Sequence, residues 1–278
     1  RYIIKMNYGL TRLERAKWTT KKWYRQLLRK IKRSPIVKWD SYVDDTYILH
    51  LDNRTDRYDV LNKELSKIKT ETGSLADSVT WFSAYQDIIS YPKNWHIDEY
   101  SFDYHWVVDP DPWFMQYIDE PFKKIQCSPA ESAISIGHLQ MWKEFLASDA
   151  ETAMFLEDDI YFDYQFEERI NSIFQYELPK DWDMLYLGAL PCHHGFTWDP
   201  HSKNLIRLYN GVWWMSSYIL TRKAAQKLVD SIPIVGPVDV WINYQFEDMK
   251  VFMTIGNLIE QTGVEDSDNT YSFVEEFY

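Results

Sequence analysis

Three consecutive carboxylates, Glu157, Asp158 and Asp159, directly follow the apolar segment 152–156. An unbroken apolar run of this length is typical of a buried strand, and ligands of open α/β sheets bind just beyond the carboxyl ends of such strands. Adjacent anions repel one another, and a divalent cation relieves that repulsion. Carboxylate oxygens suit Mg²⁺ or Mn²⁺, whose remaining ligands are commonly phosphate oxygens. The triplet therefore predicts a metal–diphosphate site; the alternative is a solvated acidic turn before the next helix.

The composition allows a large core but few covalent cross-links. Of the 278 residues, 45% are hydrophobic and 17% aromatic, which is enough for one large α/β domain or two small ones. The two cysteines, Cys127 and Cys192, provide neither a disulfide framework nor a zinc site. No segment approaches the ~18 apolar residues of a membrane span. Two cellular compartments remain as alternatives: the cytoplasm, which the low cysteine content favours, and the secretory lumen.

Charge divides the chain into two parts. Residues 1–40 hold 13 Lys and Arg against 2 Asp and Glu, whereas the rest of the chain holds 17 against 40. The acidic body argues against nucleic-acid binding, which requires a basic face. We predict a basic helical arm over residues 1–45 and one domain over 46–278. The arm suits an anionic membrane surface, a partner or the acidic body; alternatively, it is an ordinary surface helix that docks through its Trp and Leu side chains.

Strand-like and helix-like segments alternate along the body. We predict strands at 46–51, 78–85, 153–156, 183–188, 217–220 and 251–255, and helices at 56–68, 128–148, 164–174, 222–231 and 238–246. Ser128, Pro129 and Glu131 form the clearest helix start, a capping box with Pro at the first helical position. Segments 86–127 and 191–204 are expected to be an irregular insertion and a loop. The alternation predicts an α/β fold whose central sheet is mostly parallel and covered by helices on both sides.

Several blocks of the body, in this order along the chain, resemble glycosyltransferase family 25, which includes lipopolysaccharide galactosyltransferases and collagen hydroxylysine galactosyltransferases. The resemblance covers about residues 46–260. Its blocks are 47–57, 79–84, 131–143, 155–159, 183–188, 217–225 and 237–239. The sequence departs from the family pattern in two places: Gly137 stands where a Ser is expected before His138, and segment 86–127 is longer than usual. The basic arm has no counterpart in the pattern.

The resemblance implies a fold and a reaction. The fold is the nucleotide-sugar transferase type called GT-A, a single α/β domain around a central mixed sheet. The reaction moves a hexose, galactose or glucose, from a UDP-sugar to a hydroxyl of a glycan or protein acceptor with inversion. A Mn²⁺ or Mg²⁺ ion at the acidic triplet would neutralise the charge that develops on the leaving diphosphate.

Within the triplet, we assign Asp159 as the direct metal ligand and Glu157 as its partner through water or the ribose. Asp158 points the other way if the strand pleat continues, and it completes the nucleotide-binding set there.

The end of the first strand supplies the other expected nucleotide contacts, Leu51, Asn53, Arg54 and Arg57. Guanidinium groups suit phosphate and uracil oxygens; alternatively, Arg54 and Arg57 form surface ion pairs with nearby aspartates. Residues 53–55 match the N-glycosylation pattern, but a glycan there would block the donor, so we treat the match as accidental. His138 either contacts the donor or is a buried helix histidine.

An inverting displacement needs a base near the acceptor hydroxyl. We assign Asp239 to this role; its alternative role is helix capping, and Glu260 and Asp183 are rival bases. His193, His194 and His201 share a loop with Asp199, either as a second metal cluster or as part of a loop that closes over the acceptor. The Trp213-Trp214 pair is either a wall for sugar stacking or core packing.

Two other functions compete with hexosyl transfer. One is a catalytically silent transferase-like domain that binds glycans or a protein partner. The other is a glycoside hydrolase with two carboxylates, which would need neither metal nor nucleotide.

Overall fold

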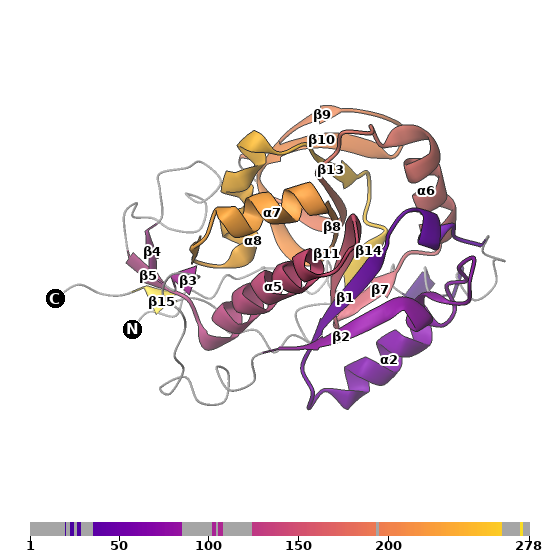
Figure 1. Ribbon diagram of the computed structural model, residues 1–278, viewed down its shortest axis with the longest axis horizontal. Coiled ribbons are helices and arrows are strands. Elements are labelled where there is room, and N and C mark those ends of the chain that lie inside the picture. Colours follow the sequence, from indigo (N-terminus) through magenta and orange to yellow (C-terminus); the bar gives the residue numbers. More distant parts are fainter. Residues whose placement is uncertain are drawn as a thin grey trace.

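A mixed eight-stranded sheet forms the centre of the computed structural model (Figure 1). The structure describes residues 36–84, 102–103, 105–107, 124–192, 195–262 and 273–274, together with Thr20, Trp23, Tyr24, Leu27 and Leu28. The strand order is β2-β1-β6-β11-β8-β13-β10-β9. The strand bounds are β1 (Asp45–His50), β2 (Val79–Ser83), β6 (Thr152–Glu157), β8 (Met184–Pro191), β9 (Thr197–Pro200), β10 (Leu205–Asn210), β11 (Val212–Thr221) and β13 (Val251–Thr254).

Most strands of this sheet run in one direction. Strand β1 pairs in parallel with β2 and β6, and β8 pairs in parallel with β13. Strand β11 is antiparallel to β6 and β8, and β10 is antiparallel to β13 and β9. Of the eight described strands, therefore, only β10 and β11 oppose the rest. The expectation of an α/β fold with a large central sheet is confirmed, and the two reversed strands make that sheet mixed.

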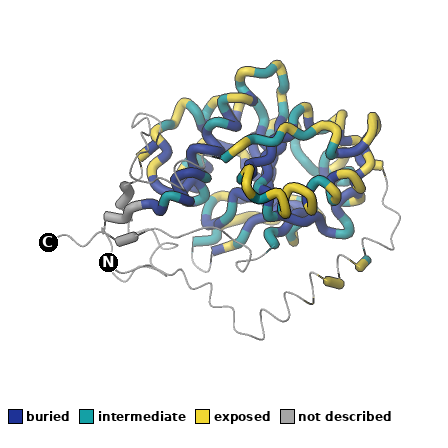
Figure 2. Tube along the Cα trace, turned by 90° about the horizontal axis from the view of Figure 1, so that it is seen from below, coloured by how far each residue is buried: buried dark blue, intermediate teal, exposed yellow. Residues whose placement is uncertain are grey.

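Helices cover both faces of the sheet (Figure 1). Helices α5 (Pro129–Ala147), α7 (Arg222–Asp230) and α8 (Val238–Trp241) pack on one face, and α2 (Thr55–Leu65) and α6 (Phe166–Ser172) on the other. Side chains alternate between these two cores because the strand period is two: Tyr47 and Leu49 belong to the first core and Ile48 to the second. The buried residues accordingly gather in the interior of the described body, and exposed residues lie along its outside (Figure 2).

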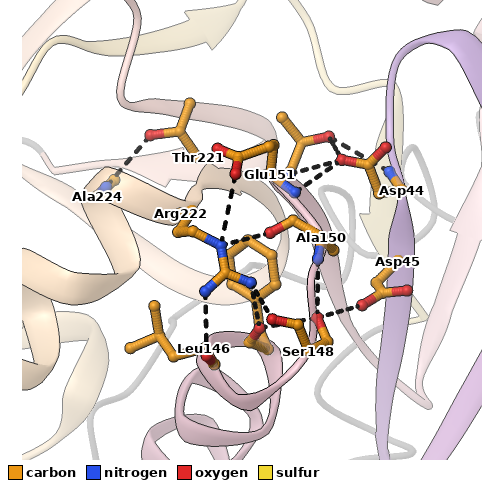
Figure 3. Close-up of polar contacts among 11 residues, drawn as sticks. Asp44, Asp45, Leu146, Ser148, Ala150, Glu151, Thr221, Arg222 and Ala224 are labelled. Atoms are coloured by element: carbon orange, nitrogen blue, oxygen red, sulfur yellow. Dashed lines mark hydrogen bonds and ion pairs between the residues drawn. The ribbon is translucent and has the colours of Figure 1, made fainter.

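Helix α5 is capped at both ends by side chains. At its start the Ser128 Oγ accepts a hydrogen bond from the Glu131 amide (3.1 Å), and the Glu131 carboxylate accepts one from the Ser128 amide (2.8 Å), which confirms the predicted capping box. At its end the Arg222 guanidinium donates to the carbonyl oxygens of Phe145 (3.3 Å), Leu146 (3.0 Å), Ser148 and Ala150 (2.7 Å) (Figure 3). A cation on the last carbonyls of a helix satisfies their lone pairs and complements the helix dipole.

Smaller elements surround the main sheet. Strand β7 (Ile160–Phe162) pairs antiparallel with β14 (Ile259–Gln261), and β3 (Phe102–Asp103) pairs in parallel with β12 (Ile234–Val235). Strands β4 (His105–Val107), β5 (Lys124–Gln126) and β15 (Phe273–Val274) form a third small sheet. The short helices are η1 (Trp39–Ser41), η2 (Leu75–Ser78), η3 (Ile173–Glu177) and η4 (Ile242–Asp248). The rest of the predicted insertion 86–127 lies outside the described residues.

Residues 36–44 pack against the body although the sequence places them in the arm. Val37, Trp39 and Val43 are buried in the second core, and the Val37 amide donates to the Lys69 carbonyl (2.8 Å). Residues 36–44, which the sequence analysis assigns to the arm, are therefore part of the packed body among the described residues. Most of the arm lies outside the described residues, so its proposed role stays a prediction. Within the described part of the chain, no helix has both the length and the apolar character to cross a membrane.

The predicted loop 191–204 is wrong at Thr197–Pro200. Residues Thr197–Pro200 form β9, which pairs with β10 at the edge of the sheet. The prediction failed because β9 is exposed along its whole length and carries a Pro and an Asp, so it lacks the apolar alternation that indicates a strand. An edge strand with one free side has less need of that pattern. Strand β10 was missed as well.

Candidate active site

The acidic triplet lies where β1 and β6 end side by side. The two strands are parallel, with Leu49 opposite Glu157, so the residues that follow both strands meet at the same edge of the sheet. Strand β11 runs antiparallel past β6, with Ser217 opposite Leu156. The first residues of β11 are therefore brought to this edge too, and they meet the start of α8 there, since the Trp214 amide donates to Asp239.

Asp158 is a buried anchor between the ends of the two strands. Its side chain is 7% exposed. One carboxylate oxygen accepts from Arg57 Nη1 (2.9 Å), and the other contacts His50 Nδ1 (3.1 Å) and the Leu51 amide (3.3 Å). The carboxylate thus joins the end of β6 to the end of β1 and to the first turn of α2. With these three contacts, both carboxylate oxygens of Asp158 bind groups of the protein.

Glu157 contacts two side chains from other elements. His138 Nε2 lies 3.3 Å from its Oε1, and Gln261 Nε2 donates to its Oε2 (3.2 Å). His138 comes from the middle of α5 and Gln261 from the end of β14, so elements above and beside the sheet fix this carboxylate. Its side chain keeps 17% of its surface exposed, which leaves an oriented anion open to solvent on one side.

Asp159 is partly buried and carries one fully buried carboxylate oxygen. Its Oδ1 has no hydrogen-bond partner among the described residues, while its carbonyl oxygen accepts from the Thr262 amide (2.6 Å). Burial, followed by the charge of Glu157, raises the pKa of Asp159 from its usual 3.8 to about 7. A desolvated carboxylate beside a second anion is energetically unfavourable, and a bound cation is one arrangement that would remove the penalty.

The residues present fit a cation that is held partly by its substrate. Within the described ranges, no set of three His, Cys, Asp or Glu side chains is arranged to hold a metal ion. Mg²⁺-type sites at phosphates, however, typically use only one or two carboxylates, and the substrate and water complete the shell. Asp159, with its unused oxygen, and the oriented Glu157 could provide this smaller set.

The two arginines expected at the nucleotide are both engaged within the protein. Arg54 donates twice to the carboxylate of Asp56 (3.0 and 2.9 Å), and this pairing lowers the Asp56 pKa to about 2. Arg57 reaches Asp158. Asn53 is exposed in the turn between β1 and α2. Of the four predicted contacts, Arg54 therefore has the surface ion pair that was its alternative role, and Leu51 uses its amide to bind Asp158.

Asp239 lies in the first turn of α8. The Trp214 amide donates to its Oδ2 (3.4 Å), and Trp214 has a φ of 75°, a conformation that is strained for a bulky residue. Burial, together with the charge of Glu157, raises the Asp239 pKa to about 6. Ser135 on α5 fixes this helix start, since its Oγ accepts from the Val238 amide (3.0 Å). The N-cap residue of α8, Pro237, has no side-chain capping bond among the described residues, while Asp239 has a pKa suited to proton transfer.

The rival bases lie in other settings. Glu260 accepts a hydrogen bond from the Tyr161 hydroxyl (2.8 Å) and is buried. Asp183 precedes β8 at the opposite end of the sheet, where it accepts from the Lys250 amide (2.8 Å) and pairs with Lys223. That position separates Asp183 from the triplet.

The structure describes part of the histidine loop and both residues of the tryptophan pair. His201 contacts the Glu177 carbonyl (2.9 Å), and Asp199 accepts from the Tyr209 hydroxyl (2.9 Å); neither contact belongs to a metal cluster among the described residues. His193 and His194 lie outside those residues. Trp213 is buried in the first core, whereas Trp214 is only partly buried beside it.

Two site-forming residues, Tyr218 and Gln261, escaped the sequence analysis. Gln261 follows Glu157 by 104 residues, and nothing in its sequence context marks it. It reaches the triplet because β14 crosses close to β8: a Cβ on Gly188 would come within 1.9 Å of the Ile259 carbonyl oxygen. Gly137 has a similar role, since a Cβ there would lie 2.6 Å from a Leu49 methyl group. The departure from the family pattern at Gly137 therefore lets α5 pack closely on β1.

Comparison with known proteins adds a family-level match. The model of the family described as "Glycosyltransferase family 25 (LPS biosynthesis protein)" matches residues 43–242. That range includes both strand ends of the site, the triplet, His138 and Asp239.

Individual relatives match at low identity. Human procollagen galactosyltransferase 2 is 26% identical over 131 residues, which cover 44% of this chain and 20% of the relative. Procollagen galactosyltransferase 1-A of Xenopus laevis is 22% identical over 210 residues, 73% of this chain and 31% of the relative. A rat protein named "Probable inactive glycosyltransferase 25 family member 3" is 23% identical over 138 residues, 46% of this chain and 23% of the relative. The matches thus span about a fifth to a third of the length of these relatives.

Proposed function

The chain belongs to glycosyltransferase family 25, and from that premise we propose that it is a metal-dependent hexosyltransferase of the GT-A type. It would move galactose or glucose from a UDP-sugar to a hydroxyl of a glycan or protein, with inversion at the anomeric carbon. The expectation of a transferase is confirmed at the level of the family, while the donor, the metal and the stereochemistry are proposals. The names of the procollagen galactosyltransferases support galactose as the first donor to try.

One observation carries the proposal: Asp159 has a buried carboxylate oxygen with no hydrogen-bond partner among the described residues, next to the oriented Glu157. An arrangement that is costly in the free protein becomes favourable when a cation and a diphosphate occupy it. We assign Asp159 to direct contact with Mn²⁺ or Mg²⁺, and Glu157 to contact through water or the ribose. The ion supplies neutralisation of the charge that develops on the leaving diphosphate.

The remaining parts of the site have separate tasks in this proposal. Asp158 keeps the ends of β1 and β6 together through Arg57 and His50, so it supports the donor site rather than binding the metal. Asn53 and Arg54 lie in the turn that follows β1, at the edge of the sheet where nucleotides bind in related architectures. The guanidinium of Arg54 would have to exchange Asp56 for the nucleotide in order to contribute directly.

Asp239 is the proposed base. In a single displacement, the acceptor oxygen forms a bond to the anomeric carbon while the bond to the UDP oxygen breaks, and the hydroxyl proton passes to a base. A carboxylate with a pKa of about 6 is ionised at neutral pH yet basic enough to take that proton as it is released. The electrostatic coupling of Asp239 to Glu157 is consistent with a base close to the donor site.

A panel of nucleotide sugars, scored for Mn²⁺-dependent hydrolysis, tests the proposal. We expect one UDP-hexose to be turned over well above the rest and Asp159→Ala to abolish that turnover. Asp199→Ala is the matched control, because this exposed carboxylate on β9 binds only Tyr209 among the described residues; it should retain turnover. Equal turnover in Asp159→Ala and the wild type would contradict the metal assignment.

The two competing functions predict different results in the same experiment. A catalytically silent domain would bind UDP or a glycan without any turnover. The name of the rat relative, which describes it as probably inactive, is the reason to test this alternative. A glycoside hydrolase would cleave glycosides in the presence of a chelator. Once the donor sugar is known, glycan and polypeptide hydroxyls can be compared as acceptors in the same assay.

A further inference from the structure

We infer that Tyr218 is a positioning residue of the donor site: it fixes the tautomer of His138 that donates a hydrogen bond to Glu157. The inference rests on the proposed function, because it gives Glu157 its role there. Three side chains form a buried chain that leads to this carboxylate. Trp142 and His138 come from α5 and Tyr218 from β11, and all three are fully buried.

The direction of each hydrogen bond in this chain follows from the chemistry of the groups. Trp142 Nε1 can only donate, and it lies 2.8 Å from the Tyr218 hydroxyl oxygen. The same oxygen lies 2.8 Å from His138 Nδ1. Since Trp142 occupies a lone pair of this oxygen, the hydroxyl proton is free to point at Nδ1. His138 Nδ1 then acts as an acceptor, and the ring carries its proton on Nε2.

The other protonation states of His138 each leave a buried group unsatisfied. If Nδ1 carried a proton, the Tyr218 hydroxyl would accept twice, and its own proton would have no acceptor among the residues that the structure describes. If Nδ1 alone were protonated, the bare Nε2 would also face the Glu157 oxygen 3.3 Å away. A buried donor without an acceptor costs about 1–3 kcal/mol. The neutral Nε2–H form satisfies every group in the chain.

This tautomer explains how Glu157 can be fixed and still remain an anion. His138 donates to Oε1 and Gln261 donates to Oε2, and in this form both donors are neutral. They orient the carboxylate without cancelling its charge, so the remaining lone pairs stay available to a cation or to the ribose. The hydroxyl of Tyr218 thereby acts on the donor site through His138, although it does not touch Glu157.

The tautomer can be read directly by NMR. We would label the seven histidines with ¹⁵N, assign His138 by its absence in His138→Gln, and record long-range ¹H–¹⁵N correlations. We expect a proton-bearing Nε2 and a bare Nδ1 in the wild type, and loss of this pattern in Tyr218→Phe. Trp142→Phe should keep it, because the contact between Tyr218 and His138 remains.

Binding of Mn²⁺·UDP, measured by calorimetry, provides the functional readout. Loss of a residue that orients a metal-site ligand typically weakens metal binding about 10- to 100-fold, so we expect the Kd of Tyr218→Phe to rise at least about tenfold. Tyr47→Phe is the matched control: this tyrosine is buried in the same core, but its hydroxyl donates to Asp45 at the far end of β1. Its Kd should not change.

The two readouts separate this inference from the proposed function. A protonated Nδ1 in the wild type overturns the inference, as does a Tyr218→Phe protein that keeps both the tautomer and the affinity. A wild type that binds neither Mn²⁺ nor UDP overturns the proposed function, and the His138 spectrum still decides the tautomer. If Tyr218→Phe does not fold, the spectra of the wild type and Trp142→Phe decide it.

Discussion

Neutralising Asp159 should stabilise the metal-free protein, whereas neutralising its neighbour Asp158 should destabilise it. The pKa of Asp159 rises from 3.8 to about 7, roughly three units, and each unit corresponds to about 1.36 kcal/mol. The folded protein thus binds this proton more tightly than the unfolded chain does. The stability that goes with the bound proton is present below pH 4 and is lost as the pH rises through 7. At pH 8 the ionised group costs up to about 4 kcal/mol.

The assay is urea unfolding of the EDTA-treated protein at pH 4.5 and pH 8. Asp159→Asn should unfold with a free energy several kcal/mol above that of the wild type at pH 8, and the difference should shrink at pH 4.5. Asp158→Asn breaks a buried ion pair with Arg57 and should lose about 3–5 kcal/mol. With saturating Mn²⁺ and UDP the wild type should gain stability relative to Asp159→Asn, because the ligand stabilises only a protein that binds it.

Two results would refute this reasoning. If Asp159→Asn were less stable than the wild type at pH 8, the carboxylate would be compensated in a way that the geometry does not reveal. If the stability difference did not depend on pH, a protonation difference would not be its cause.

Three further outcomes test other parts of the structure. Wild-type kcat/KM should rise with pH through about 6 as Asp239 ionises, and Asp239→Asn should lower kcat by about 10²- to 10⁴-fold at every pH. Arg222→Ala should lower the free energy of unfolding in urea by about 2–3 kcal/mol, since the last carbonyls of α5 lose their donor. Gln226→Ala, which changes an exposed residue on α7, the helix that also carries Arg222, should alter this free energy by less than about 0.5 kcal/mol. Gly188→Ala should cost about 1–3 kcal/mol or more in the same assay and weaken UDP binding, because its methyl group would displace Ile259 and the strand that carries Gln261.

The sequence predicted best those features that depend on local chemistry. The capping box at Ser128 is present in the structure because Ser, Pro and Glu at these positions satisfy a helix start whatever lies around it. The strands β1, β6 and β8 each contain a run of apolar residues and were placed within three residues of their observed bounds. Each of these features depends on residues that are adjacent in sequence.

Features that depend on tertiary crossings were not predictable. Strand β9 is exposed and short, and only its pairing with β10 identifies it. Gln261 reaches Glu157 because Gly188 lets two strands approach each other. The partner of Arg57 could not be chosen from the sequence either, since nearby aspartates were equally good candidates; the fold selects Asp158, which lies 101 residues away.

Three adjacent carboxylates of one short motif end in three different environments, and this difference is what makes the motif a site. A solvated turn would leave all three groups hydrated and equivalent. Here the middle one pairs with Arg57, the first contacts His138 and Gln261, and the Oδ1 of the third is buried without a hydrogen-bond partner among the described residues. Of the three, the middle carboxylate alone has a direct ion pair with an arginine among the described residues. We propose that the other two attract a divalent cation, so Asp158 and Asp159 should not be interchangeable even though they are chemically identical.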